Sequence, residues 1–248
     1  MSVLRTEGLV KRYGALVVTD QVSLDIQVGE LHAVIGPNGA GKTTLINQLS
    51  GELRADHGRI FFEDTDVTEV PIHGRARLGL MRSYQIVSLF EEFTALENAA
   101  LAALGAKQHI WRFWRPMVRD VEVRRAATEA LAATGLSMRE DVLAGELSYG
   151  ERRQLELAMA LAAEPKTLLL DEPLAGMSQK ESSSIIELLR KLKHRHTIVL
   201  VEHDMDAVFS LADRISVLAF GNVIFTGTPD EIRRHPEVRA AYLGEEVV

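Results

Sequence analysis

Residues 36–43 read GPNGAGKT and directly follow an apolar run at 31–35. The octapeptide matches the pattern G-x-x-x-x-G-K-[ST], in which glycines let backbone N–H groups turn toward phosphate oxygens without obstruction by a Cβ. The next segment carries Leu45 and Leu49 with helical spacing. A helix that begins here adds unpaired N–H donors and a favourable dipole. The sequence therefore predicts a strand, a phosphate-binding loop and a helix, in that order.

This loop predicts a bound nucleoside triphosphate with Mg²⁺. Lys42 would lie along the β- and γ-phosphates, and the Thr43 hydroxyl would ligate the metal. The competing interpretation is a glycine-rich turn without a ligand, which is disfavoured because every fixed position of the pattern is filled. The motif does not by itself predict hydrolysis. The residues expected to contact the nucleotide are Gly36, Pro37, Asn38, Gly39, Ala40, Gly41, Lys42, Thr43 and Thr44.

A second motif, LLLDEP at residues 168–173, is an apolar run that ends in two carboxylates. Buried charge is costly unless it is paired or bound to a metal, so adjacent acids at the end of a core strand need a reason. Asp171 fits the role of holding the Mg²⁺ shell. Glu172 would then orient and polarise an attacking water as general base, a role worth about 10²–10⁴ in rate. The alternative is a solvated loop start, which the phosphate loop upstream disfavours.

Strand and helix patterns alternate toward both ends of the chain, whereas the middle is helical in character. Strands are predicted at 3–9, 22–28, 31–35, 59–63, 167–170, 197–201, 217–220 and 223–225. Good helix formers predict helices at 94–104, 118–134 and 178–193. We therefore expect one α/β domain over 1–248, with a mostly parallel sheet built from 1–85 and 164–248 and a helical insertion at 86–163.

The composition excludes several classes of protein. The 248 residues include no cysteine, which excludes disulfides, and the net charge of −7 disfavours nucleic acid as a partner. No secretory segment follows Met1, and the apolar runs fall short of the roughly 18 residues that a membrane span needs. We therefore expect a protein that does not cross a membrane by itself.

Residues 147–154, LSYGERRQ, allow three interpretations. Ser148 and Glu151 have the spacing of a helix capping box. A catalytic nucleophile on a G-x-S-x-G turn is disfavoured because Glu146 occupies the first glycine position. A serine and a glycine at a helix N-terminus can also bind an anion. The stretch resembles the LSGGQ signature of ABC (ATP-binding cassette) ATPases and, as in that family, lies just before the LLLDEP strand.

The resemblance implies a P-loop NTPase cassette with a RecA-like core, an antiparallel β subdomain and a helical subdomain. It also implies that two cassettes pair head to tail around ATP and Mg²⁺, so that Ser148 and Gly150 would bind the γ-phosphate held by the partner's loop. Tyr149 replaces the first signature glycine and Glu151 the usual glutamine. In the stretch EPLAGMSQ, Ser178 stands where the family commonly has aspartate, which leaves communication between the two ATP sites open.

Three further positions match motifs of the family. Gln85 in RSYQIVSLF matches the glutamine that senses Mg²⁺ and the γ-phosphate, and an ordinary surface glutamine is the alternative. His203 in VLVEHD matches the switch histidine that contacts the γ-phosphate, as a third catalytic residue beside Glu172 and Lys42; a structural histidine is the alternative. A metal site at 202–204 is disfavoured because side chains alternate along a strand. Tyr13 in KRYGALVV matches the aromatic residue that stacks on adenine, or is an exposed residue at a strand edge.

Within the family, LSYG, EPLAGM, VEHDM and the terminal AYLGEE are most similar to ATP-binding subunits of branched-chain amino acid importers. Urea or amide importers and lipopolysaccharide exporters are alternatives inside the family; a soluble ABC ATPase or a P-loop kinase lies outside the transporters. The resemblance implies an identical or paralogous second cassette, permease subunits and, indirectly, a solute-binding protein as partners. It places the chain peripherally at the cytoplasmic face of the inner membrane. Trp111 and Trp114, among basic residues, would contact a membrane partner or pack within their own hairpin.

Overall fold

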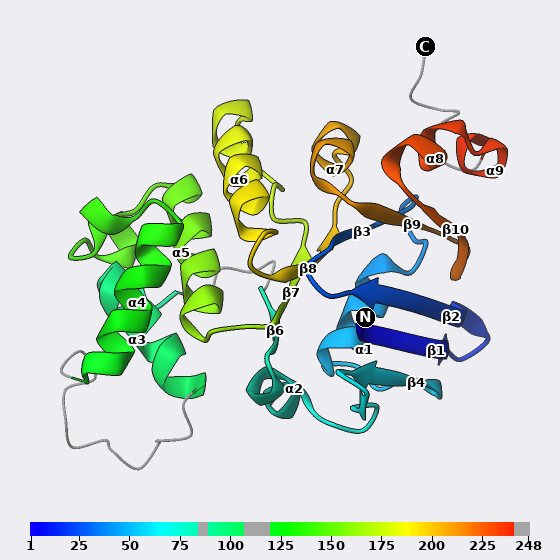
Figure 1. Cartoon of the computed structure of the whole chain (residues 1–248), viewed down its shortest axis with the longest axis horizontal. Helices are drawn as coiled ribbons and strands as arrows, with labels where there is room; N and C mark the ends of the chain where they lie inside the picture. Colours follow the sequence, from blue (N-terminus) through cyan, green and yellow to red (C-terminus); the bar gives the residue numbers. More distant parts are fainter. Residues whose placement is uncertain (84–88, 107–119, 241–248) are drawn as a thin grey trace.

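The computed structural model describes residues 1–83, 89–106 and 120–240. Two sheets and several helices make up this part of the chain, with α3 (Ala95–Ala106), α4 (Val121–Ala133) and α5 (Tyr149–Ala162) grouped at one end (Figure 1). The small antiparallel sheet lies toward the other end, and the larger sheet extends from the middle of the molecule to that same end.

The larger sheet determines where the candidate site residues lie. In the described chain its strand order is β10-β9-β3-β8-β7-β6, with every neighbouring pair parallel except β9 and β10. The strands are β3 (Leu31–Ile35), β6 (Leu80–Arg82), β7 (Thr167–Asp171), β8 (Thr197–Val201), β9 (Arg214–Ala219) and β10 (Asn222–Gly227). Strands β3, β7 and β8 are buried along their whole length, which explains why their sequences are mostly apolar. Their carboxyl ends meet at one edge of the sheet.

The smaller sheet is antiparallel in the order β2-β1-β4-β5. It consists of β1 (Ser2–Tyr13), β2 (Leu16–Gln27), β4 (His57–Phe62) and β5 (Thr65–Asp66). The helix α1 (Lys42–Ser50) packs between the two sheets, since its Leu45, Ile46 and Leu49 join a buried cluster with residues of both. This cluster fixes the axis of the helix that follows the phosphate loop.

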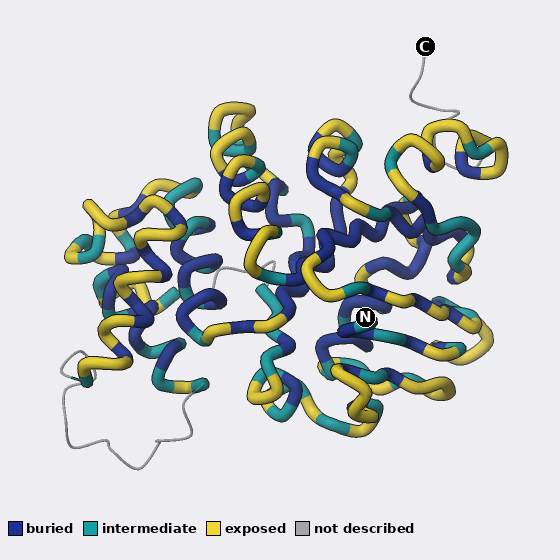
Figure 2. Tube along the Cα trace, in the orientation of Figure 1, coloured by how far each residue is buried: buried dark blue, intermediate teal, exposed yellow. Residues whose placement is uncertain are grey.

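The remaining helices cover the large sheet or follow it. They are α2 (Ile72–Leu78), α6 (Gln179–Leu192), α7 (Met205–Leu211), α8 (Pro229–Arg234) and α9 (Pro236–Val238), with short 3-10 turns at Ser137–Arg139 and Ala144–Glu146. A second buried cluster joins α3, α4 and α5 to the face of the sheet that α6 and α7 cover. In Figure 2 the buried residues run along the sheet and the inner sides of these helices, while their outer turns are exposed.

The fold class predicted from the sequence is confirmed: α/β with a mostly parallel sheet, a separate antiparallel sheet and added helices. Several local predictions were incomplete or wrong. Helix α2 was not predicted, and neither was strand β6, whose three residues are too few to show a periodicity. Phe220 was predicted to lie in a strand, but it lies in the turn between β9 and β10 with a φ of 49°.

Candidate functional site

The phosphate loop connects β3 to α1 and depends on glycine at two positions in particular. Gly36 and Gly41 have φ angles of 154° and 103°. A Cβ at Gly36 would collide with the carbonyl oxygen of Leu218, and a Cβ at Gly41 with that of Val18. The loop is therefore pressed against the neighbouring backbone and keeps the conformation that its sequence predicts.

Lys42 lies at the start of α1 with its ammonium turned back into the loop. Its Nζ donates hydrogen bonds to the carbonyl oxygens of Gly36 at 2.6 Å and Pro37 at 3.0 Å. Burial lowers the pKa of Lys42, while the nearby carboxylates of Glu172 and Asp171 oppose that shift. The structure thus brings the loop cation and the two acids of the LLLDEP motif into electrostatic contact.

Asp171 ends β7 and is only 4% exposed. Arg82, from the neighbouring strand β6, donates from Nη2 to its Oδ2 at 3.0 Å, and also contacts Asn47 and Glu52. Burial raises the pKa of Asp171, and Arg82 opposes the shift by stabilising the charged form. Arg82 was not predicted as a site residue, because only the pairing of β6 with β7 brings it to Asp171.

Glu172 follows in a left-handed conformation with a φ of 47°. Such a backbone is uncommon for a residue with a side chain and costs of order 1–3 kcal/mol unless its surroundings hold it. Its amide donates to the carbonyl oxygen of Val201, the last residue of β8, at 2.9 Å. The turn that carries the candidate base is therefore fixed to the adjacent strand.

The run 202–204 is divided among three different environments. Glu202 is fully buried, His203 is exposed, and the Asp204 side chain caps α7 by accepting from the amide of Ala207. Within the described residues, no group of three or more His, Cys, Asp or Glu side chains could hold a metal ion. The metal interpretation of this run, already disfavoured by the sequence, has no geometric basis.

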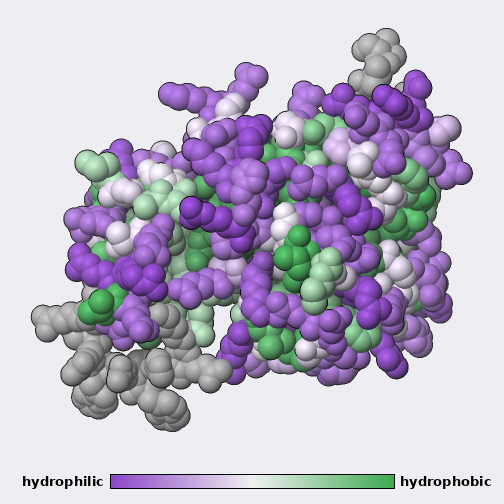
Figure 3. Space-filling model, viewed as in Figure 1, coloured by the Kyte–Doolittle hydropathy of each residue, from purple (hydrophilic) through white to green (hydrophobic). Residues whose placement is uncertain are grey.

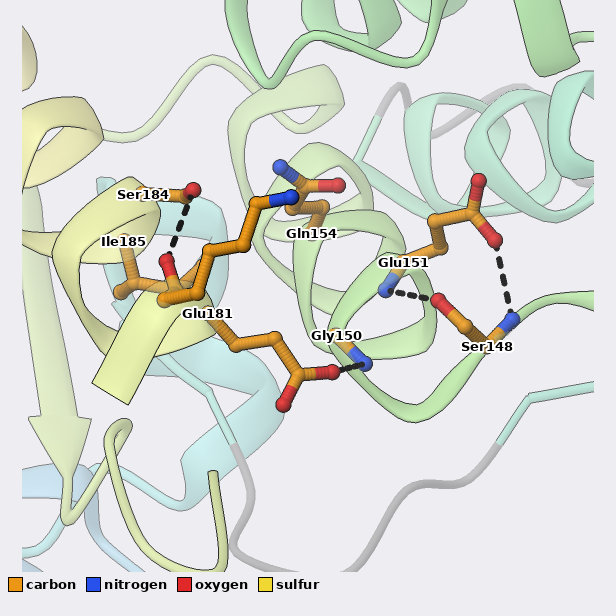
Figure 4. Close-up of a pocket in the computed structure, with 8 residues that line it drawn as sticks. Ser148, Gly150, Glu151, Gln154, Glu181, Ser184 and Ile185 are labelled. Atoms are coloured by element: carbon orange, nitrogen blue, oxygen red, sulfur yellow. Dashed lines mark hydrogen bonds between the residues drawn. The ribbon is translucent and has the colours of Figure 1, made fainter. Parts of the chain in front are cut away.

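Ser148 and Gly150 lie at the N-terminus of α5, beside the start of α6 (Figure 4). The capping box predicted from the sequence is present: the Ser148 hydroxyl accepts from the amide of Glu151, whose side chain accepts from the amide of Ser148. The amide of Gly150 donates to Glu181 of α6 at 3.2 Å. These residues line a cavity of about 240 Å³ together with Gln154, Lys180, Ser184 and Ile185.

The residue that departs from the usual signature, Tyr149, is the first residue of α5 and has no positive φ, so it introduces no backbone strain. Its hydroxyl donates to the carbonyl oxygen of Ala175 at 3.0 Å and accepts from Arg153 at 3.1 Å. Ser178, the other departure, caps α6 in a capping box with Glu181. Both side chains therefore have local partners at the contact between α5 and the segment after β7.

The other predicted residues are more dispersed. Tyr13 ends β1 with its side chain exposed, and the ammonium of Lys11 lies 5.8 Å from its ring centre. Gln85, Trp111 and Trp114 lie outside the described residues. Hydrophilic residues cover most of the surface seen in Figure 3, and the described helices include none long and apolar enough to traverse a bilayer.

Comparison with known proteins agrees with this arrangement. Residues 19–175 match the ABC transporter family, and residues 222–248 match the family of branched-chain amino acid ATP-binding cassette transporters. The chain is 39% identical over 252 residues to the high-affinity branched-chain amino acid transport ATP-binding protein LivG of Salmonella typhimurium, with 98% of each chain covered. It is 36% identical to the lipopolysaccharide export system ATP-binding protein LptB of Haemophilus influenzae, with 99% of each covered.

Solved structures give the same result. The crystal structure of the ADP conformation of an ATP-binding cassette of an ABC transporter superposes with a TM-score of 0.87 at 32% identity, covering 99% of this chain and 100% of that one. The chain therefore belongs to the ABC transporter family and is a nucleotide-binding ATPase with the cassette fold. Within that family it is an ATP-binding subunit of the LivG type, as its sequence motifs predict.

Proposed function

We propose that two cassettes close around two molecules of MgATP, each contributing its phosphate loop to one nucleotide and its signature helix to the other. The observation that carries this proposal is the position of Ser148 and Gly150. Their cavity is lined by residues of α5 and α6 and by none of the phosphate loop. A serine and a glycine at a helix N-terminus can bind an anion, and here the amide of Gly150 donates to the carboxylate of Glu181. A phosphate held by a second chain would fill that role.

Within each site we assign Lys42 and the loop amides to the β- and γ-phosphates, and Tyr13 to the adenine ring. Glu172 is the general base for the attacking water, and His203 organises water and charge at the γ-phosphate. The strained turn at Glu172, held by β8, fits a group whose orientation matters.

The Thr43 hydroxyl and the Asp171 carboxylate fit Mg²⁺, which prefers such oxygen ligands, and Gln85 would complete the set. When bound, the metal would neutralise charge on the transferred phosphoryl group. Arg82 fixes the orientation of Asp171 by donating a hydrogen bond to its carboxylate, as supporting residues around metal ligands do.

We further propose that hydrolysis drives import of branched-chain amino acids or related small polar solutes through a permease, with the chain bound peripherally at the cytoplasmic face of the inner membrane. This rests on the names of its relatives, LivG and BraF, which are branched-chain amino acid transport ATP-binding proteins. A solute-binding protein would deliver the cargo to the permease. The second candidate is lipopolysaccharide export, because LptB matches over nearly the whole chain at only slightly lower identity.

The shared-site proposal can be tested by mixing two inactive variants. Lys42→Ala removes the loop cation and Ser148→Ala removes the signature hydroxyl, and each alone should lose most ATP turnover. A mixed dimer keeps one intact site, formed by the loop of the second variant and the signature of the first. With random pairing and independent sites, the mixture should recover about a quarter of the wild-type rate.

A mixture that stays at the level of the separate variants, while wild type turns over under the same conditions, would exclude the shared site. Turnover by Glu172→Gln tests the base in the same assay, since wild-type-like hydrolysis would remove this residue from the mechanism. If only a paralogous cassette supports turnover, the two substitutions are placed on opposite cassettes of that pair.

A further inference from the structure

Glu202 is a fully buried carboxylate at the carboxyl end of β8, directly before His203. Burying a carboxylate is costly unless its charge is paired or hydrogen-bonded. Among the described residues its one ion-pair partner is His203, at 3.6 Å from Nδ1. Burial raises the pKa of Glu202, and the backbone amides of Leu174 and His203 oppose the shift.

The two oxygens of this carboxylate accept from the backbone of two different segments. Oε1 accepts from the amide of Leu174 at 2.8 Å, and Oε2 accepts from the amide of His203 at 3.0 Å. Leu174 lies two residues after Glu172. A single buried side chain thus joins the turn of the candidate base to the backbone of the switch histidine.

The turn at Glu172 is held at both ends by consecutive residues at the end of β8. Val201 accepts from the amide of Glu172 through its carbonyl oxygen, and Glu202 accepts from the amide of Leu174 through its carboxylate. A left-handed backbone at a residue other than glycine persists when the surrounding structure determines it from more than one side. The first of these contacts needs only a strand backbone, whereas the second needs this particular side chain.

We propose that Glu202 is a positioning residue for ATP hydrolysis, which holds Glu172 and His203 in a fixed relation through the amides of Leu174 and His203. It acts without touching the nucleotide. This inference rests on the proposed roles of Glu172 and His203 and adds the group that aligns them. Misplacement of a catalytic group by about 1 Å can cost on the order of 100-fold in rate, so alignment of this kind is measurable.

The first test is Glu202→Gln in the full chain, under conditions where wild type turns over. Glutamine has one acceptor oxygen, and its NH₂ group would face one of the two N–H donors. We expect kcat to fall about 10- to 100-fold, because the alignment is lost. KM for ATP should change less than about threefold, because the phosphate loop is untouched. Glu202→Asp, which keeps the charge on a shorter side chain, should have a kcat between those of wild type and Glu202→Gln.

Glu30→Gln is the matched control, because Glu30 is also a buried carboxylate at the edge of a core strand, paired with His32 at 2.9 Å. We expect it to lower stability without lowering kcat. A kcat of Glu202→Gln within twofold of wild type would overturn the proposal. So would an equal loss of kcat in the folded Glu30→Gln variant, since that would indicate a general effect of stability.

A double-mutant cycle separates alignment from a structural effect. If Glu202 acts through Glu172, adding Glu202→Gln to Glu172→Gln should change the residual single-turnover rate less than about twofold. A loss in the double variant as large as in Glu202→Gln alone would contradict this route. The cycle also separates the two proposals, because a Glu172→Gln variant that hydrolyses ATP normally contradicts the base assignment itself.

The contact has a readout that does not need turnover. In the wild-type protein, the ¹⁵N-resolved amide signals of Leu174 and His203 should carry the downfield shift of N–H groups bonded to a carboxylate, and both should move in Glu202→Gln. If neither moves, Glu202 does not hold these amides and the proposal fails even where a variant is too unstable for kinetics.

Discussion

Arg75 on helix α2 is the largest fully buried side chain in the described part of the protein, at 2% exposure. Its guanidinium donates to four backbone carbonyl oxygens, at 2.7–3.0 Å: those of Gln48, Leu49, Thr68 and Val70. The first two belong to the last turn of α1, the helix that begins at the phosphate loop. Burial lowers the pKa of Arg75 to about 10, which leaves it charged at neutral pH.

Arg75→Ala therefore removes a cationic cap from the carboxyl end of α1 and leaves four acceptors to find new partners. Water entering the space can serve some of them. If half are left without a partner, at about 1–3 kcal/mol each, the free energy of unfolding falls by about 2–6 kcal/mol. For a domain of this size the melting temperature should fall by roughly 10 °C.

Urea unfolding followed by circular dichroism measures this change. Arg77→Ala is the matched control, since Arg77 lies on the same helix but is exposed, and its removal should stay within about 0.5 kcal/mol of wild type. Arg75→Lys keeps the charge without the planar array of donors, so its free energy of unfolding should lie between those of wild type and Arg75→Ala. If the free energy of unfolding of Arg75→Ala lay within about 1 kcal/mol of wild type, the four hydrogen bonds would not be what stabilises the carboxyl end of α1.

Two further outcomes follow from the site. Because the pKa of Asp171 is raised, its carboxyl becomes protonated at a higher pH than that of an ordinary aspartate. Mg²⁺-dependent nucleotide binding should therefore begin to weaken at a higher pH, on acidification, than it would with an unperturbed carboxylate. A titration of Mg²⁺ affinity against pH checks this. Tyr149→Phe removes a hydroxyl bonded to Ala175 and Arg153 and should lower the free energy of unfolding by about 1 kcal/mol, measured by urea unfolding, while ATP binding to the phosphate loop stays unchanged; a stability equal to wild type would contradict it.

Much of the candidate site could be predicted from the sequence because its residues lie in short continuous motifs at strand ends. The phosphate loop follows β3, Asp171 ends β7 and His203 comes shortly after β8, and these three strands are neighbours in the sheet. Parallel strands bring their carboxyl ends to one edge, so three motifs far apart in the chain meet once the strands are recognised. The capping box at Ser148 was predictable for the same reason, since it needs only four consecutive residues.

The residues that the sequence did not identify act across the fold. Arg82 reaches Asp171 only because β6 pairs with β7, and β6 is too short to have a pattern of its own. Two of the four carbonyl oxygens that Arg75 binds lie 26 and 27 positions away, a separation that no local spacing encodes. Glu202 stands beside a recognisable histidine, yet its role depends on a backbone amide 28 positions upstream. The sequence therefore does not identify the buried charged residues that support the site. Each of them needs a hydrogen-bond or ion-pair partner, and only the fold brings that partner close.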